Sequence, residues 1–345
     1  MRDSIFYSAF RALAVSFCVV IGLFLGFICL TFLLGMLSTG TVEQKLTPTF
    51  TEEILPNAKG KRESLASTTP IILQVNIEGI IGTDQLSEET VRNQLIESRE
   101  GNYKNDRVKG VLVYINTPGG TVTGADGIYR ALKEYKQKYQ VPIFAYVDGL
   151  CASGGMYVAL AADKIIATET SLIGSVGVIA PAFVNVTKLL EKIGVDALTI
   201  SAGKGKDALN PLRPWKPGEE KNYVELIDFF YDHFVNLVAN NRKDLSREKL
   251  VQEYGAHIFP APLAQEYGFI DKSGMSLADT LQILADAAGI TDDQYQVIRL
   301  EHKGWWKTLF SSKTSLLQGK IEHQLTISPE IDIQFRNQFL YLYTP

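Results

Sequence analysis

The fold is decided around residues 148–163, which read DGLCASGGMYVALAAD. They follow the run VPIFAYV at residues 141–147, whose length and β-forming apolar residues predict a buried strand. Asp148-Gly149 ends that strand with turn residues, and Ser153 stands where the next helix begins. The Ser153 hydroxyl would then lie near the unpaired backbone N–H groups at the N-terminus of a helix. These N–H groups and the helix dipole stabilise an oxyanion. The alternative is an N-cap serine followed by glycines for close packing, and this stretch alone leaves both open.

Strands and helices alternate on both sides of this stretch. Alternation at intervals of a few tens of residues predicts an α/β domain built from βαβ-like units. A long amphipathic helix then covers residues 223–238, with an apolar stripe typical of a core or subunit contact. The other predicted strands are residues 70–79, 110–115, 164–167, 174–178 and 197–201, and the other predicted helices begin at Ser87, follow Gly120 and Ser153, and cover 184–193.

Composition excludes several classes of function. The chain has 345 residues, room for one large or two modest domains, and a net charge of -4, which gives no electrostatic footprint for nucleic acid. Its three cysteines form no disulfide framework. With four histidines and neither a Cys-x-x-Cys nor a His-Glu-x-x-His pattern, we expect no metal site.

The N-terminal region predicts a membrane anchor. Residues 12–37 carry no charge, and as a helix they span roughly 39 Å, more than the ~30 Å hydrocarbon core. A cleaved signal peptide is the alternative, but its apolar core is shorter. Arg2 and Arg11 precede the span, whereas the next basic residue after it is Lys45, so we expect the N-terminus in the cytoplasm. Residues 38–70, rich in Thr, Ser and Pro, are expected to be a flexible spacer.

Glycine pairs follow two of the predicted strands, at Gly119-Gly120 and at Gly154-Gly155. Without a Cβ, each lets the backbone approach a bound carbonyl, and donors from two loops converging on one point form an oxyanion hole. Phosphate binding is the other common use of such turns. No Walker-type loop and no G-x-G-x-x-G occurs at the strand ends, so we reject it.

A nucleophilic Ser153 needs a base. The four histidines lie far downstream in contexts typical of surface or packing residues, and Cys151 occupies the first glycine position of a G-x-S-x-G elbow. Lysine is the other option, and Lys204 and Lys206 lie in AGKGKD. An ordinary lysine titrates near ~10.4, so this role requires burial. The alternative for this loop is a solvated basic turn.

Four motifs follow one another along the chain: VYINTPGGTV at 113–122, YVDGLCASGGMYVALAADKIIAT at 146–168, SLIGSVGVIA at 171–180 and SAGKGKDALNP at 201–211. In this order they resemble the signal peptide peptidase A (protease IV) family of membrane-anchored Ser–Lys peptidases. The resemblance covers roughly residues 71–288 and implies the Clp-protease/crotonase-like ββα spiral fold, an α/β class, with one N-terminal transmembrane helix.

The resemblance implies a role for each matching residue. Ser153 corresponds to the nucleophile and Lys206 to the general base and later acid, with Asp207 following the lysine as the pattern demands. Lys204 departs from the family, which has one lysine in this loop. Ser175 corresponds to the serine that orients the lysine amine.

Two glycines correspond to the oxyanion hole. Gly120 and Gly154 would supply the N–H groups, with Gly119 a possible substitute for Gly120. Cys151 is expected to be a buried structural thiol. No cofactor and no metal is needed for this chemistry.

The resemblance further implies a serine endopeptidase that degrades signal peptides left in the membrane after cleavage, and other peptides. It implies a homo-oligomer in the bacterial cytoplasmic membrane with the catalytic domain on the outer side. The alternatives are a crotonase-type acyl-CoA enzyme and a catalytically inactive membrane scaffold. The expected domains are a cytoplasmic N-terminus at 1–11, a transmembrane helix at 12–37, a spacer at 38–70, a peptidase domain at 71–290 and a C-terminal extension at 291–345.

Overall fold

The computed structural model describes residues 5–37, 50–291, 294–302 and 339–343. The chain forms two compact units, residues 1–48 and 49–345. The first unit contains helix α1, Ile5–Leu37, which includes the whole predicted span. Within the described residues, α1 is the one helix long and apolar enough to cross a membrane, with a mean hydropathy of 2.2 over Phe10–Phe27.

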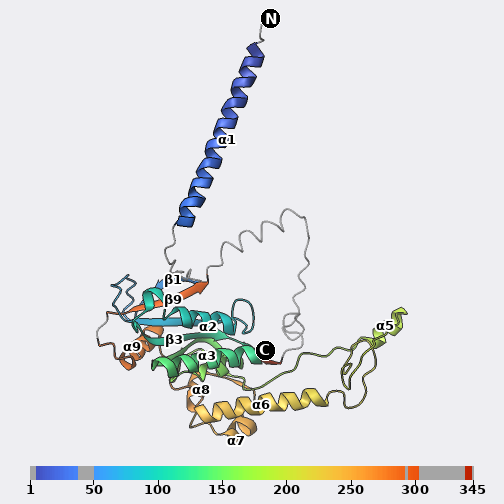
Figure 1. Cartoon of the computed structure of the whole chain (residues 1–345). Coiled ribbons are helices and arrows are strands. Elements are labelled where there is room, and N and C mark those ends of the chain that lie inside the picture. The colour runs from blue at the N-terminus through green and yellow to red at the C-terminus, as the bar shows by residue number, and fades with distance from the viewer. Residues whose placement is uncertain (1–4, 38–49, 292–293, 303–338, 344–345) are drawn as a thin grey trace. The chain divides into compact units, whose positions relative to one another are not determined.

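The second unit is built on an eight-stranded mixed sheet, in the order β1-β9-β2-β3-β5-β7-β8, with β6 also pairing β5 (Figure 1). Strands β2, β3 and β5 run parallel at its centre. A separate two-stranded sheet pairs β4 with β10. The strands are β1 Phe50–Leu55, β2 Ile71–Glu78, β3 Val108–Thr117, β4 Gly119–Thr121, β5 Ile143–Ala152, β6 Lys164–Ala167, β7 Leu172–Gly174, β8 Ile258–Pro260, β9 Gln296–His302 and β10 Leu340–Leu342.

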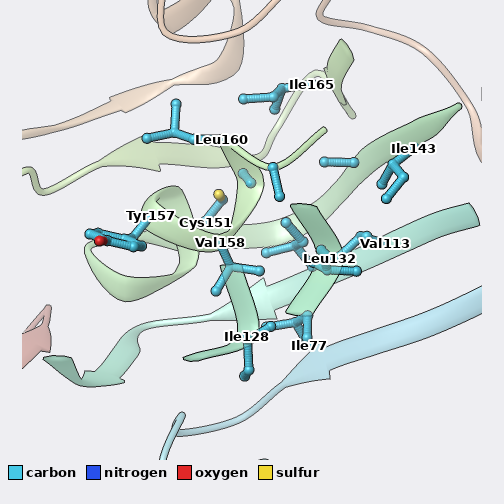
Figure 2. Packing of buried hydrophobic residues seen from close by; sticks show 14 of the residues in the cluster. Ile77, Val113, Ile128, Leu132, Ile143, Cys151, Tyr157, Val158, Leu160 and Ile165 are labelled. Atoms are coloured by element: carbon cyan, nitrogen blue, oxygen red, sulfur yellow. The ribbon is translucent and has the colours of Figure 1, made fainter. Parts of the chain in front are cut away.

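Helices cover both faces of the sheet. Strand β2 is buried on both sides: Val75 and Ile77 belong to the larger core and Ile72 to the smaller one. Figure 2 shows Ile77 among the side chains that pack in the larger core, with Ile128 and Leu132 of α3. The helices are α2 Glu88–Glu97, α3 Val122–Tyr139, α4 Gly154–Ala159, α5 Thr187–Ile193, α6 Lys221–Asn241, α7 Arg247–Lys249, α8 Ala261–Glu266 and α9 Leu277–Ala287, with a 3-10 turn at Gly101–Tyr103 and a π turn at Leu250–Tyr254.

The α/β prediction is confirmed, and several local predictions are corrected. Strand β1 lies inside residues 38–70, where a spacer was expected, because it pairs along its whole length with β9. Strands β9 and β10 lie inside the expected extension at 291–345. A strand was predicted at residues 174–178, but the strand in this region, β7, ends at Gly174. Residues 197–201 form no strand, and Leu198 and Ile200 are 87% and 88% exposed, since no strand of the described chain lies beside them.

Candidate active site

Ser153 lies between the end of β5 and the start of α4 in an unusual backbone conformation. Its φ of 53° and ψ of -113° are unfavourable for a residue with a Cβ. The surrounding sheet holds it there: its N–H donates to the Gly174 carbonyl at 2.8 Å, and its carbonyl accepts from the Tyr157 N–H at 3.0 Å. Its hydroxyl makes no cap to α4 and lies 3.5 Å from the Gly177 carbonyl. Ser153 thus occupies the N-cap position of α4 without making a side-chain capping bond.

Three glycines converge beside this serine. Strand β4 follows β3 after Pro118 and ends at Thr121, whose hydroxyl caps α3 by accepting from the Gly124 N–H. A Cβ placed on Gly119 would lie 2.7 Å from the Gly154 nitrogen, and one on Gly154 would lie 3.2 Å from the Gly120 nitrogen. These contacts leave no room for a side chain. Backbone N–H groups of two loops thus meet at one point, the geometry that stabilises an oxyanion.

Ser175 is beside Ser153 because their strands are neighbours in the sheet. Strands β5 and β7 run parallel with Ala152 opposite Gly174, so the two serines follow the ends of adjacent strands. Ser175 also has a positive φ, 54°, and its N–H donates to the His257 carbonyl at 2.7 Å. The two serines therefore follow the ends of neighbouring strands, and the predicted role of Ser175 in orienting the lysine amine stays a prediction.

Lys206 lies outside this cluster. It is exposed in a series of turns between α5 and α6, as is Lys204. Among the described residues no hydrogen bond joins its amine to Ser153, which is only 1% exposed. The loop itself is ordered by Arg213, which contacts Asp207 at 2.5 Å and Glu219 at 2.8 Å. Figure 1 shows this segment, with α5, leaving the sheet.

A polar network around the buried Tyr157 lies one helical turn beyond the serine, and the sequence did not point to it. The Tyr157 hydroxyl donates to Asp126 of α3 at 2.9 Å and lies 2.9 Å from Nε2 of His233 on α6. Burial and the nearby Asp126 carboxylate raise the pKa of Tyr157, so it stays a neutral phenol that can donate. This network ties α4 to α3 and α6 and so fixes the helix that follows the serine.

Cys151 lies in the core beneath the site (Figure 2). Burial raises the pKa of its thiol to about 12, so the group stays protonated and unreactive near neutral pH. The prediction of a buried structural thiol agrees with this placement.

Strand β10 is the second feature that sequence reasoning missed. Its residues pair antiparallel with β4, with Tyr341 opposite Gly120 and Leu342 opposite Gly119. The alternation of residues 339–343, FLYLY, was the available signal, because a period of two with aromatic residues is typical of a strand.

Comparison with known proteins identifies the family. The model of peptidase family S49 matches residues 135–291, which include Ser153, Ser175 and Lys206. A protein of Enterococcus faecium named as a signal peptide peptidase, SppA, is 31% identical over 272 residues, covering 78% of this chain and 76% of its own length. The chain belongs to peptidase family S49.

Two other relatives extend the comparison. A protein of Synechocystis named as a protease, slr0021, is 33% identical over 68% of this chain and 80% of its own length. The chloroplastic serine protease SPPA of Arabidopsis thaliana is 30% identical over 58% of this chain, which is 29% of that protein. The resemblance to the signal peptide peptidase A family is thereby confirmed, and the S49 chain is a protease.

The Clp protease family model matches residues 61–173, the part that contains β2, β3, β5 and the serine. The predicted Clp-protease-like fold of this S49 chain is confirmed. That fold positions the candidate site: its parallel strands end side by side and present Ser153 and the glycines at one edge.

Proposed function

We propose that this S49 chain is a serine endopeptidase in which Ser153 is the nucleophile and Lys206 the general base. The observation that carries the proposal is the strained Ser153, held beside converging glycine N–H groups at the ends of parallel strands. The hydroxyl makes no capping bond to α4, and its contact with the Gly177 carbonyl is long, at 3.5 Å. Ser175 follows the end of the neighbouring strand, and its proposed role is to orient the incoming amine.

The proposed reaction is acyl transfer to the serine followed by hydrolysis. Ser153 Oγ attacks the carbonyl carbon of the peptide while Lys206 Nζ takes the hydroxyl proton, and the N–H groups of Gly120 and Gly154 bind the oxyanion. As the C–N bond breaks, the Lys206 ammonium returns the proton to the leaving amine. Water, deprotonated by Lys206, then cleaves the ester and regenerates Ser153.

This mechanism requires Lys206 to reach a buried serine, and a second copy of the chain supplies the route. The segment around Lys206 exposes large apolar side chains, a feature of subunit interfaces. A lysine acts as a base only when its amine is neutral, which requires burial. Docking this segment on a neighbouring subunit buries both the apolar side chains and the amine. The exposed apolar residues are Val184, Leu189, Ile193, Val195, Leu198 and Ile200.

We further propose the location and substrates. Helix α1 anchors the chain in the bacterial cytoplasmic membrane, with the N-terminus in the cytoplasm and the peptidase unit on the outer side. An anchor holds the site near peptides left in the bilayer, so signal-peptide remnants are the proposed substrates. The name of the Enterococcus relative agrees with this assignment.

Peptide hydrolysis by single-residue variants tests the mechanism. Ser153→Ala is expected to lower kcat by at least about 10³-fold, and Lys206→Met by a similar factor, because the two act as one unit. Lys204→Met is the matched control and should keep kcat within about threefold, because its amine takes no part in the chemistry. Equal losses in both lysine variants, or turnover retained by Ser153→Ala, would contradict the assignment.

A further inference from the structure

We propose that one side-chain hydrogen bond, between Tyr157 and Asp126, sets the spacing of the two N–H groups of the oxyanion hole. Tyr157 and Asp126 are then positioning residues, because they act through the backbone of the loops that precede them. This inference rests on the proposed peptidase function of the same site, in which Gly120 and Gly154 bind the oxyanion.

The two glycines come from separate parts of the chain. Gly120 lies in β4, which leads directly into α3, and Gly154 is the first residue of α4. A Cβ on Gly154 would lie 3.2 Å from the Gly120 nitrogen, so the two backbones approach each other closely. A donor contributes only when it lies about 2.7–3.1 Å from the developing oxyanion. The relative position of the two loops therefore determines whether both N–H groups can bind one oxygen atom.

The hydrogen bond joins the two helices that follow these loops. Tyr157 lies about one turn into α4 and Asp126 about one turn into α3, and the Tyr157 hydroxyl donates to Oδ1 of Asp126 at 2.9 Å. Tyr157 is also bonded to the start of its own helix, because its N–H donates to the Ser153 carbonyl at 3.0 Å. A path of one helical turn on each side thus connects the two glycine loops.

Tyr157 is the one residue of α4 whose side chain offers a hydroxyl or an N–H group. The helix reads GGMYVA, so its other residues are glycines or have apolar side chains. The Tyr157 side chain is fully buried, which leaves its hydroxyl dependent on partners in the protein. A helix of six residues has little stability of its own, so contacts such as this one fix its position.

Two further contacts hold this hydrogen bond in place. Asp126 accepts from the Arg130 Nε–H on its other oxygen at 2.8 Å, which orients the carboxylate. Because the Tyr157 hydroxyl donates its one hydrogen to Asp126, its oxygen accepts from Nε2 of His233, 2.9 Å away. The phenol is therefore held from α3 and from α6, and Tyr157→Phe removes both contacts while it keeps the ring.

Two buried tyrosines provide matched variants in the full chain. Tyr157→Phe removes the bridging hydroxyl, and Tyr135→Phe removes another buried hydroxyl, 2.9 Å from Ser98 Oγ, near the other end of α3. We expect Tyr157→Phe to lower kcat for peptide hydrolysis about tenfold with KM within about twofold, because a displaced donor weakens binding of the transition state alone. Tyr135→Phe should leave both constants within about twofold.

Variants of Asp126 test the same bond from its other side. Asp126→Asn keeps an acceptor oxygen and should keep kcat within about threefold. Asp126→Leu removes the acceptor and should lower kcat about tenfold, as Tyr157→Phe does. The double variant of Asp126→Leu and Tyr157→Phe should be no slower than either single variant, because both changes remove one interaction.

Hydrogen exchange separates this inference from the chemistry. In Ser153→Ala protein, residues 154–160 should exchange about tenfold faster when Tyr157→Phe is added, and at the unchanged rate when Tyr135→Phe is added. If exchange follows this pattern and no variant hydrolyses peptides, the proposed reaction fails and the positioning role stands.

Either of two results overturns the inference. One is that Tyr157→Phe keeps kcat within about twofold while Ser153→Ala abolishes it, because the donors are then held without this bond. The other is that Tyr157→Phe and Tyr135→Phe lower kcat by the same factor, because the loss then follows from weakened packing anywhere in the core.

Discussion

Ser153 holds its backbone in a conformation that costs a non-glycine residue about 1–3 kcal/mol. Two backbone hydrogen bonds hold the residue in this conformation. The Ser153 N–H donates to the Gly174 carbonyl of β7, and the Ser153 carbonyl accepts from the Tyr157 N–H of α4. In the same conformation the hydroxyl does not cap the helix and lies 3.5 Å from the Gly177 carbonyl. At this residue, stability is given up for a reactive placement.

This strain is measurable with two inactive variants. Ser153→Gly and Ser153→Ala both remove the hydroxyl, but glycine adopts a positive φ without strain. We expect the free energy of unfolding to be about 1 kcal/mol higher for the glycine variant. Urea denaturation of the two proteins measures the difference. Equal values would mean that the serine conformation is not strained.

Some of the strands can be predicted from the sequence alone, and others cannot. The long apolar runs of β2, β3 and β5 are predictable, and so is the position of Ser153, because burial and turn residues are local signals. Strand β1 is not, and β10 offers only the short alternation FLYLY, since both are strands through pairing with distant parts of the chain. Residues 197–201 show the opposite error: they have β-forming residues, but they pair with no strand of the described chain.

The loop that carries Lys206 depends on one arginine. Arg213 lowers the pKa of both Asp207 and Glu219, chiefly through hydrogen bonds to their carboxylates. Because these carboxylates have lower pKa values in the folded than in the unfolded chain, their ion pairs stabilise the loop fully at a pH above the unfolded pKa values. This stabilisation is lost as the pH falls through the folded pKa values. The loop is therefore ordered at neutral pH and loosens in acid.

Arg213→Met should disorder the loop without affecting the sheet. We expect faster hydrogen exchange at residues 203–210, an unchanged melting temperature, and kcat about tenfold lower because Lys206 is no longer positioned. The matched control is Arg247→Met, which breaks an exposed ion pair with Asp232. Unchanged exchange in the Arg213 variant would contradict the role of the arginine.

At the scale of the whole molecule, the proposed site is incomplete in one chain. The serine and glycines belong to the sheet, and the lysine belongs to a segment with an exposed apolar surface. In the proposed homo-oligomer, a closed ring of identical subunits would complete every site, since each copy would present its lysine segment to the next. The Clp-protease-like fold agrees with such an assembly.

Mixing two inactive variants tests this arrangement. Ser153→Ala and Lys206→Met are unfolded and refolded together at equal amounts. If each site takes its serine and lysine from different chains, random assembly restores about a quarter of wild-type activity. Each variant refolded alone is the control and should stay inactive. An inactive mixture that has the same mass as the wild-type assembly would show that one chain supplies both residues.

The position of β9 sets the order in which this protein acquires its structure. It lies between β1 and β2, although it follows them by more than two hundred residues, and Thr51 bonds to Glu301 across 250 positions. Until residue 302 has left the ribosome, β2 keeps an unpaired apolar edge, and such edges promote aggregation. Contacts this distant in sequence also slow folding. The sheet is therefore completed only after nearly all of the chain has been synthesised, which makes the nascent protein a natural client for chaperones.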